Sequence, residues 1–111
     1  MKGTYLGEFE EIILLTVGVL HPNAYGVSVK SEVENQTERK QTLSAIHAVL
    51  NRLEKKGFLK SDFGAATNER GGKRKRLFQI TQDGRKAIEA SRSLRDKLWD
   101  KIPDVALNPE L

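Results

Sequence analysis

Apolar side chains in the first half of the chain recur every three or four residues in three separate stretches, a spacing typical of amphipathic helices. The first stretch runs from about residue 9 to Pro22, a residue that disfavours helix before it. The second is expected over about 25–35. The third follows Thr42, whose hydroxyl can cap a helix, and stops at Gly57. The apolar positions are Phe9, Ile12, Ile13, Val17 and Leu20; Tyr25, Val29 and Val33; and Leu43, Ile46, Leu50 and Leu53.

Beyond Gly57 the pattern changes to short apolar runs, which predict a two-stranded antiparallel hairpin. The runs lie near 58–63 and 77–80 and are separated by a charged, glycine-rich loop over 64–73. Thr81 can then cap a last helix that ends at Pro103. Its capping box is only half formed, because Gly84 stands where an acidic side chain would complete it. The predicted fold is mainly α with a small two-stranded β wing.

The last helix is too long for the rest of the chain to cover. It would have about 20 residues and a length of about 30 Å, so its distal half would stay exposed in a single chain. Pairing with a second copy about a two-fold axis would bury that half, which predicts a homodimer. The alternative is that the helix folds back over its own domain. The expected organisation is a winged-helix domain over 1–81, a dimerisation helix over 82–102 and a flexible tail over 103–111. The predicted dimerisation residues are Leu94, Leu98, Trp99 and Ile102.

Positive charge is concentrated in one segment. The formal net charge is +4 and the sequence pI is about 9.5. Residues 51–76 carry nine Lys/Arg against three Asp/Glu, whereas residues 1–50 carry four against six and residues 77–111 carry six of each. This local excess favours an anionic partner. A solvated loop is the alternative interpretation.

The polar face of the third predicted helix carries small, hydrogen-bonding and cationic side chains. Such a face fits the major groove of duplex DNA, which is about 12 Å wide. A merely solvated helix face is the alternative. Thr42, Ser44, His47 and Asn51 are candidates for base contacts, and the cations would neutralise phosphates. The full candidate DNA-binding set is Thr42, Ser44, His47, Asn51, Arg52, Lys55, Arg70, Lys73, Arg74, Lys75 and Arg76.

Four segments together resemble the PadR-type transcriptional regulators over about residues 7–101. They are Gly-Glu-Phe-Glu-Glu-Ile-Ile-Leu-Leu at 7–15, Ala-Tyr-Gly at 24–26, Leu-Asn-Arg-Leu-Glu-Lys-Lys-Gly at 50–57 and Lys-Arg-Leu-Phe-Gln-Ile-Thr-Gln-Asp-Gly-Arg at 75–85. The resemblance implies a winged helix-turn-helix with a long C-terminal dimerisation helix. It also implies a dimeric, bacterial, repressor-like protein whose third helix enters the major groove while the wing grips the DNA backbone or minor groove. Where the family commonly has glycine and then tyrosine-proline early in that helix, this chain has Ser44 and then His47-Ala48, so a base preference is not carried over.

Other classes of function lack the residues they need. The chain has no cysteine, and its two histidines are isolated from any nucleophile, phosphate-loop or metal-ligand spacing. We therefore expect no catalysis, metal or cofactor. The longest apolar stretch, 12–20, is far shorter than the roughly 20 residues that span a bilayer, so we expect no membrane partner. The absence of cysteine suits a reducing compartment, and we expect a cytoplasmic protein. A winged-helix module that binds protein instead of DNA is the competing hypothesis. Trp99 could line an apolar effector pocket at the dimer seam or simply pack there.

Overall fold

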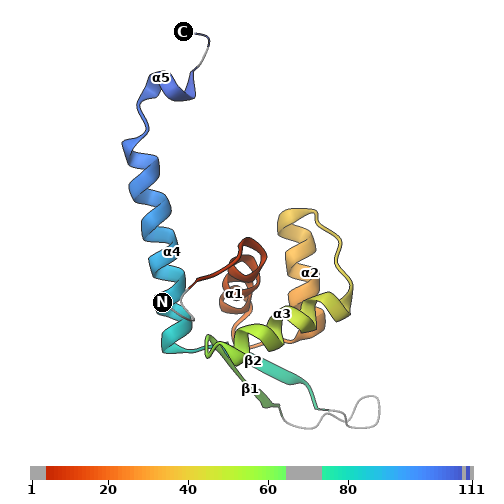
Figure 1. Ribbon diagram of the computed structural model, residues 1–111. Coiled ribbons are helices and arrows are strands. Elements are labelled where there is room, and N and C mark those ends of the chain that lie inside the picture. The colour runs from red at the N-terminus through yellow and green to blue at the C-terminus, as the bar shows by residue number, and fades with distance from the viewer. Residues whose placement is uncertain (1–4, 65–73, 109, 111) are drawn as a thin grey trace.

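A computed structural model of the chain describes residues 5–64, 74–108 and 110 (Figure 1). The predicted order of helices and hairpin is confirmed. The elements are α1 (Glu8–Leu20), α2 (Gly26–Thr37), α3 (Leu43–Lys55), β1 (Leu59–Phe63), β2 (Arg76–Ile80), α4 (Gln82–Lys101) and α5 (Asp104–Leu107).

The core lies where α1, α2 and α3 pack together against the hairpin. Most side chains of the three predicted stripes are buried there, together with Phe78 from β2. Leu43 differs, because it sits on the first turn of α3 and is 38% exposed, and Val49 is buried in addition. The fully buried large side chains are Phe78, Ile13, Leu14, Ile46, Leu50, Leu53, Leu59, Val17, Val29 and Val33.

Helix α2 is displaced toward the C-terminus relative to the expected 25–35. Tyr25 is its N-cap rather than part of the helix, and the Ser28 hydroxyl accepts a hydrogen bond from the Tyr25 amide at 3.0 Å. At the other end the helix continues through Thr37, whose hydroxyl donates to the Val33 carbonyl at 2.7 Å. Glu38 follows in the left-handed conformation with φ 59°.

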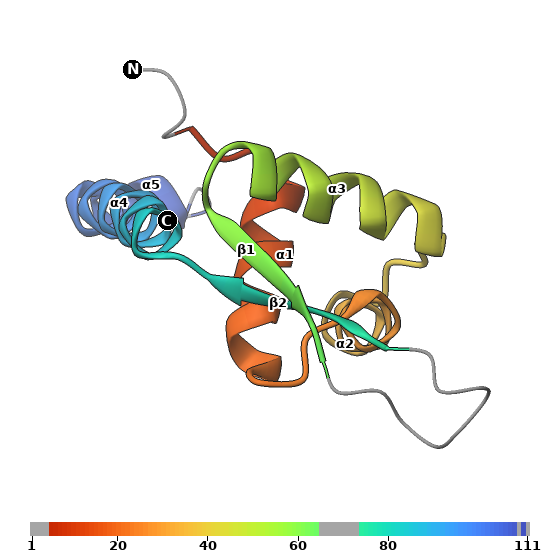
Figure 2. The same cartoon turned by 90° about the horizontal axis from the view of Figure 1, so that it is seen from below.

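The two strands form the antiparallel hairpin that the sequence predicts. Leu59 pairs with Ile80 at the open end of the hairpin and Phe63 pairs with Arg76 toward the tip. The Phe78 amide also donates to the Ala24 carbonyl at 2.8 Å, so β2 is bonded to the connection between α1 and α2 (Figure 2). The tip over 65–73 lies outside the described residues.

Helix α4 is anchored to the domain at its start, and farther along it one ion pair joins Arg95 to Glu11 of α1. The Thr81 hydroxyl accepts from the Gly84 amide at 3.0 Å and donates to the Gly57 carbonyl at 2.6 Å. Gly84 has no room for a side chain, because a Cβ there would overlap the Phe58 carbonyl oxygen. This close approach explains the glycine that left the predicted capping box incomplete.

Past this anchor α4 projects away from the helical domain, and the molecule reaches 63 Å along its longest axis (Figure 1). The helix does not fold back over its own domain. In the segment expected as a tail, Asp104–Leu107 forms the short helix α5, with the Ala106 amide donating to the Pro103 carbonyl at 2.9 Å. Three packed helices, a two-stranded wing and a long C-terminal helix define a winged helix-turn-helix, as predicted. Within residues 5–64 and 74–108, no helix is both long and apolar enough to cross a bilayer.

Candidate nucleic-acid interface

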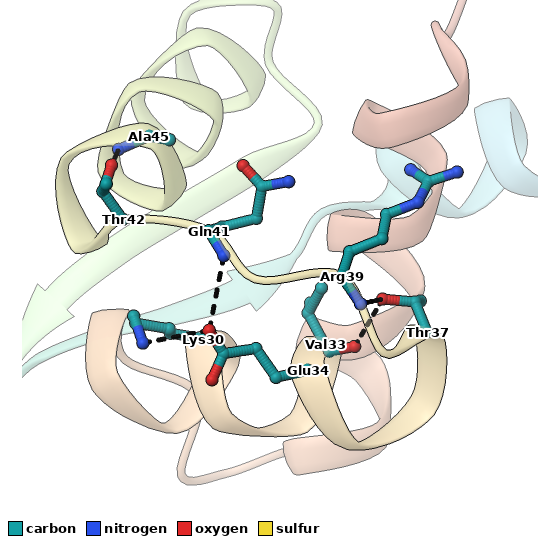
Figure 3. Close-up of polar contacts among 8 residues, drawn as sticks. All are labelled: Lys30, Val33, Glu34, Thr37, Arg39, Gln41, Thr42 and Ala45. Carbon is teal, nitrogen blue, oxygen red and sulfur yellow. Dashed lines mark hydrogen bonds and ion pairs between the residues drawn. The ribbon is translucent and has the colours of Figure 1, made fainter.

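The turn between α2 and α3 is held by side chains that hydrogen-bond to its backbone (Figure 3). The Glu34 carboxylate accepts hydrogen bonds from the Lys30 ammonium at 3.0 Å and from the Gln41 backbone N–H at 3.3 Å. The hydrogen bond from Lys30, helped by that from Gln41, lowers the pKa of Glu34. The Thr37 hydroxyl accepts from the Arg39 amide at 3.1 Å. These bonds fix how the chain leaves α2 and enters α3.

The start of α3 has the cap that the sequence predicts. The Thr42 hydroxyl accepts from the Ala45 amide at 3.0 Å, which satisfies one of the backbone donors left unpaired at a helix start. Its own hydroxyl hydrogen remains able to donate to a ligand. Thr42 is exposed at the start of α3, and Ser44 and Ala48 are exposed one turn apart on its outward face.

His47 is placed differently from its neighbours on that face. It is half-buried, and its imidazole packs so closely against Gly26 of α2 that a Cβ at Gly26 would overlap the ring. The side chain therefore fills the contact between α2 and α3.

Arg52 points toward the first turn of α1. Its Nε donates to Glu10 at 2.8 Å, and Lys56 donates to the same carboxylate at 2.9 Å. The carboxylate also accepts from the Gly7 amide at 2.9 Å. Burial by itself would raise the pKa of Glu10, but the hydrogen bonds from Arg52, Lys56 and Gly7 outweigh it and lower the pKa to about 2. Glu10 therefore joins α1 to α3, a role beyond the stabilisation of a helix end.

Arg76 begins β2 and reaches back to α3. Its Nη2 donates to Glu54 at 2.6 Å and its Nη1 to the Asn51 Oδ1 at 3.1 Å, while its Nε donates to the Ser61 hydroxyl at 3.0 Å. The guanidinium carbon lies 4.8 Å from the centre of the Phe78 ring. These contacts bind the tip end of the strand pair to α3 and place both on one side of the domain.

The remaining cations of the predicted set differ in how they are held. Lys55 and Arg74 are exposed. Lys75 lies over the Tyr25 ring, with its ammonium 4.5 Å from the ring centre, and is also exposed. Arg70 and Lys73 lie outside the described residues. Of the described cations predicted to meet phosphate, Arg52 and Arg76 are engaged with acidic partners in the chain, and Lys55, Arg74 and Lys75 face solvent.

The distal half of α4 presents apolar side chains to solvent. Leu94 and Leu98 are each 58% exposed and Trp99 is 63% exposed, whereas Ile102 is half-buried. Arg95 between them donates to Glu11 of α1 at 3.0 Å. The predicted dimerisation residues thus line a helix that leaves its own domain.

Sequence reasoning missed the acidic residues that organise this face. Glu10, Glu34 and Glu54 each receive at least one cation or backbone amide from another part of the chain. Glu34 carried a local signal, since Lys30 lies four residues earlier. For Glu10 and Glu54 the cationic partners come from other elements, and no periodicity in the sequence links them.

A three-helix domain with a wing beside its third helix defines the winged-helix class of transcriptional regulators. The family model "Transcriptional regulator PadR-like family" matches residues 14–90, so the chain belongs to the PadR-like family. A search of curated proteins gives no match.

Solved structures share the fold at low identity. RosR of H. salinarum, in the complex named hsRosR-S1, superimposes with a TM-score of 0.72 at 18% identity, covering 99% of this chain and 90% of that one. A PadR-like regulator of Bacillus cereus gives 0.69 at 15% identity, covering 88% and 90%. A PadR family regulator of Clostridium difficile gives 0.63 at 21% identity, covering 80% and 91%.

Proposed function

We propose that this PadR-like regulator binds specific sites in double-stranded DNA as a homodimer and acts as a repressor. Helix α3 would enter the major groove, and the basic wing would lie against the phosphate backbone. The observation that carries this proposal is the outward face of α3. It is exposed at Ser44, Ala48 and Asn51, whose side chains are small or polar, and it ends at the exposed cation Lys55.

The described contacts narrow the set of DNA-binding candidates. Thr42, Ser44 and Asn51 are the strongest candidates for base contacts, because their polar side chains are exposed at the start of α3 or along it. His47 is a weaker one, because its ring packs on α2. Lys55 and Arg74 are the best placed for phosphate, and Arg70 and Lys73 keep that role as predictions from the sequence alone.

The proposal of a dimer rests on the solvent-exposed apolar side chains of α4. A two-fold pair joined there would bury Leu94, Leu98 and Trp99 and present two copies of α3 to successive half-sites. Trp99 has two competing roles in such a pair, packing in the seam or lining an effector pocket. A ligand that quenches the fluorescence of this single tryptophan without dissociating the dimer would favour the pocket.

Duplex binding at two salt concentrations tests the function. The probe is the DNA immediately upstream of this protein's own coding region, compared with a duplex of scrambled sequence. We expect tighter binding to the upstream DNA and a steep loss of affinity with salt, because phosphate contacts release counterions. Arg74→Ala removes one phosphate contact from each subunit of the dimer, so it should reduce the number of released counterions by about two; Glu89→Ala, on an exposed position of α4, serves as the control.

Two outcomes would redirect the proposal. Equal, weak binding to both duplexes at low salt would contradict site-specific recognition. Failure to bind any duplex would favour the competing function, a winged-helix module that docks on protein. The direction of regulation needs a reporter gene under the upstream region, whose expression should rise when the regulator is removed.

A further inference from the structure

The guanidinium of Arg76 is held from several sides by its own chain. Its three nitrogens donate to acceptors on α3 and β1, and its plane stacks near the buried Phe78 ring. A cation that only contacts a phosphate would not need these hydrogen bonds within its own chain. The arrangement instead resembles the support that keeps a neighbouring side chain in one orientation, and the neighbour that faces solvent is Asn51.

The chemistry of this contact fixes which way the Asn51 amide points. A guanidinium carries only donors, so the Asn51 atom that faces Arg76 must be the carbonyl oxygen. The amide nitrogen of Asn51, with its two N–H donors, therefore lies at the opposite end of the same planar group. Asn51 presents donors outward, while its acceptor is turned toward the wing.

This orientation limits which base edge Asn51 can read. The usual bidentate contact to adenine requires the amide oxygen to accept from N6 while the nitrogen donates to N7. An outward amide nitrogen instead suits a pure acceptor in the major groove, such as O6 and N7 of guanine or O4 of thymine.

We propose that Arg76 is a positioning residue that fixes the Asn51 amide as a donor, so that this position of α3 reads guanine or thymine in preference to adenine. Glu54 and Ser61 hold Arg76 in place from α3 and β1. The inference rests on the proposed function, because it needs α3 to enter the major groove. It departs from the simpler expectation that Arg76 contacts phosphate directly.

Arg76→Lys separates the two roles, because it keeps the charge and loses the planar fork. The preferred site of the wild-type protein is first selected from a randomised duplex library. The position read by Asn51 is then identified as the one whose preference disappears in Asn51→Ala. Affinities of the wild-type protein and each variant are finally measured by fluorescence anisotropy on four duplexes that differ only at that position, at two salt concentrations.

A positioning role predicts a selective loss. The wild-type protein should prefer guanine or thymine over adenine by roughly tenfold, within the range of a good base contact. Arg76→Lys should reduce this preference to about twofold or less while leaving the salt dependence unchanged. Adding Asn51→Ala to Arg76→Lys should cause no further loss of this base preference. The matched control Arg74→Ala should weaken all four duplexes equally and lower the salt dependence.

Several results would overturn the inference. A wild-type preference for adenine at the Asn51 position would do so, as would an unchanged preference in Arg76→Lys. If melting by circular dichroism shows that Arg76→Lys does not fold, Glu54→Gln replaces it, since it removes the charge that holds Nη2; a retained preference in that variant also overturns the inference. Normal salt-dependent duplex binding in such cases leaves the proposed function standing, whereas absence of any duplex binding by the wild-type protein refutes both.

Discussion

The face formed by α3 and the wing differs sharply from the distal half of α4, although both are exposed. On the first face, two of the cations are tied to other elements of the same chain, Arg76 to Glu54 and Arg52 to Glu10. On the second, Leu94, Leu98 and Trp99 have more than half of their surface in solvent. The polar face is therefore arranged within one chain, and the apolar one gains its stability only when something covers it.

Leu98→Asp is the change expected to have the largest effect on this comparison. A two-fold pair buries two copies of Leu98, one from each subunit, so replacement by a carboxylate should cost the dimer about 4 kcal/mol, roughly a thousandfold in dissociation constant. Sedimentation velocity, or dilution followed by the fluorescence of Trp99, measures the change. Ser93→Asp adds the same charge to the polar face of α4 and should leave the dimer intact. A wild-type protein that is monomeric at micromolar concentration would contradict the role given to α4.

Gly84→Ala tests how closely the start of α4 packs against the helical domain. A methyl group there would overlap the Phe58 carbonyl oxygen, so we expect a loss of about 2–3 kcal/mol in the free energy of unfolding. At an exposed helix position the same exchange would stabilise by about 1 kcal/mol. The sign of the change in the free energy of unfolding, measured with denaturant, therefore shows whether steric overlap or helix propensity dominates. Ala90→Gly, on the exposed side of α4, measures the effect of helix propensity alone.

Glu10→Gln removes the carboxylate that joins α1 to α3. Because the folded pKa is about 2, below the ordinary 4.5, the ionised form stabilises the fold fully above pH 4.5. That stabilisation is lost as the pH falls toward 2. We expect the variant to be less stable by about 2 kcal/mol at pH 7. This value allows for solvent screening of the ion pair with Arg52, whose side chain is half-exposed. The difference from the wild-type protein should shrink in acid.

Unfolding by urea at pH 7, 4 and 3 measures this difference. Glu8→Gln is the matched control, because Glu8 pairs with Arg39 on the surface and its loss should matter less. A gap between the wild-type protein and Glu10→Gln that stays constant with pH would show that the ion pairs do not provide the stabilisation.

Glu38→Gly is expected to have the smallest effect, and a stabilising one. Glu38 ends α2 with φ 59°, a conformation that glycine adopts without a Cβ penalty. A gain of about 0.5–1 kcal/mol in thermal unfolding is expected. Ser31→Gly, in the middle of α2, should instead lose about 1 kcal/mol. A destabilised Glu38→Gly would mean that its side chain contributes more to the turn than its backbone conformation costs.

Local patterns were sufficient for much of the fold. Thr42 and Thr81 cap their helices as predicted, because a cap depends on residues only three positions apart. The hairpin and the exposed apolar residues of α4 were also predicted from the spacing of apolar residues within short segments. Gly84 was the exception, since the backbone that excludes its side chain comes from the residue at 58.

By itself, the sequence determined the order of the elements, the winged-helix class and the segment with excess positive charge, because each depends on residues that are close in the chain. Only the tertiary structure decided which polar groups of α3 are used inside the molecule. Arg52 meets a carboxylate 42 positions away, and Asn51 meets a guanidinium 25 positions away. Such pairs form only after the helices and the wing have packed, so a cation that appears available for DNA in the sequence can already be engaged in the fold.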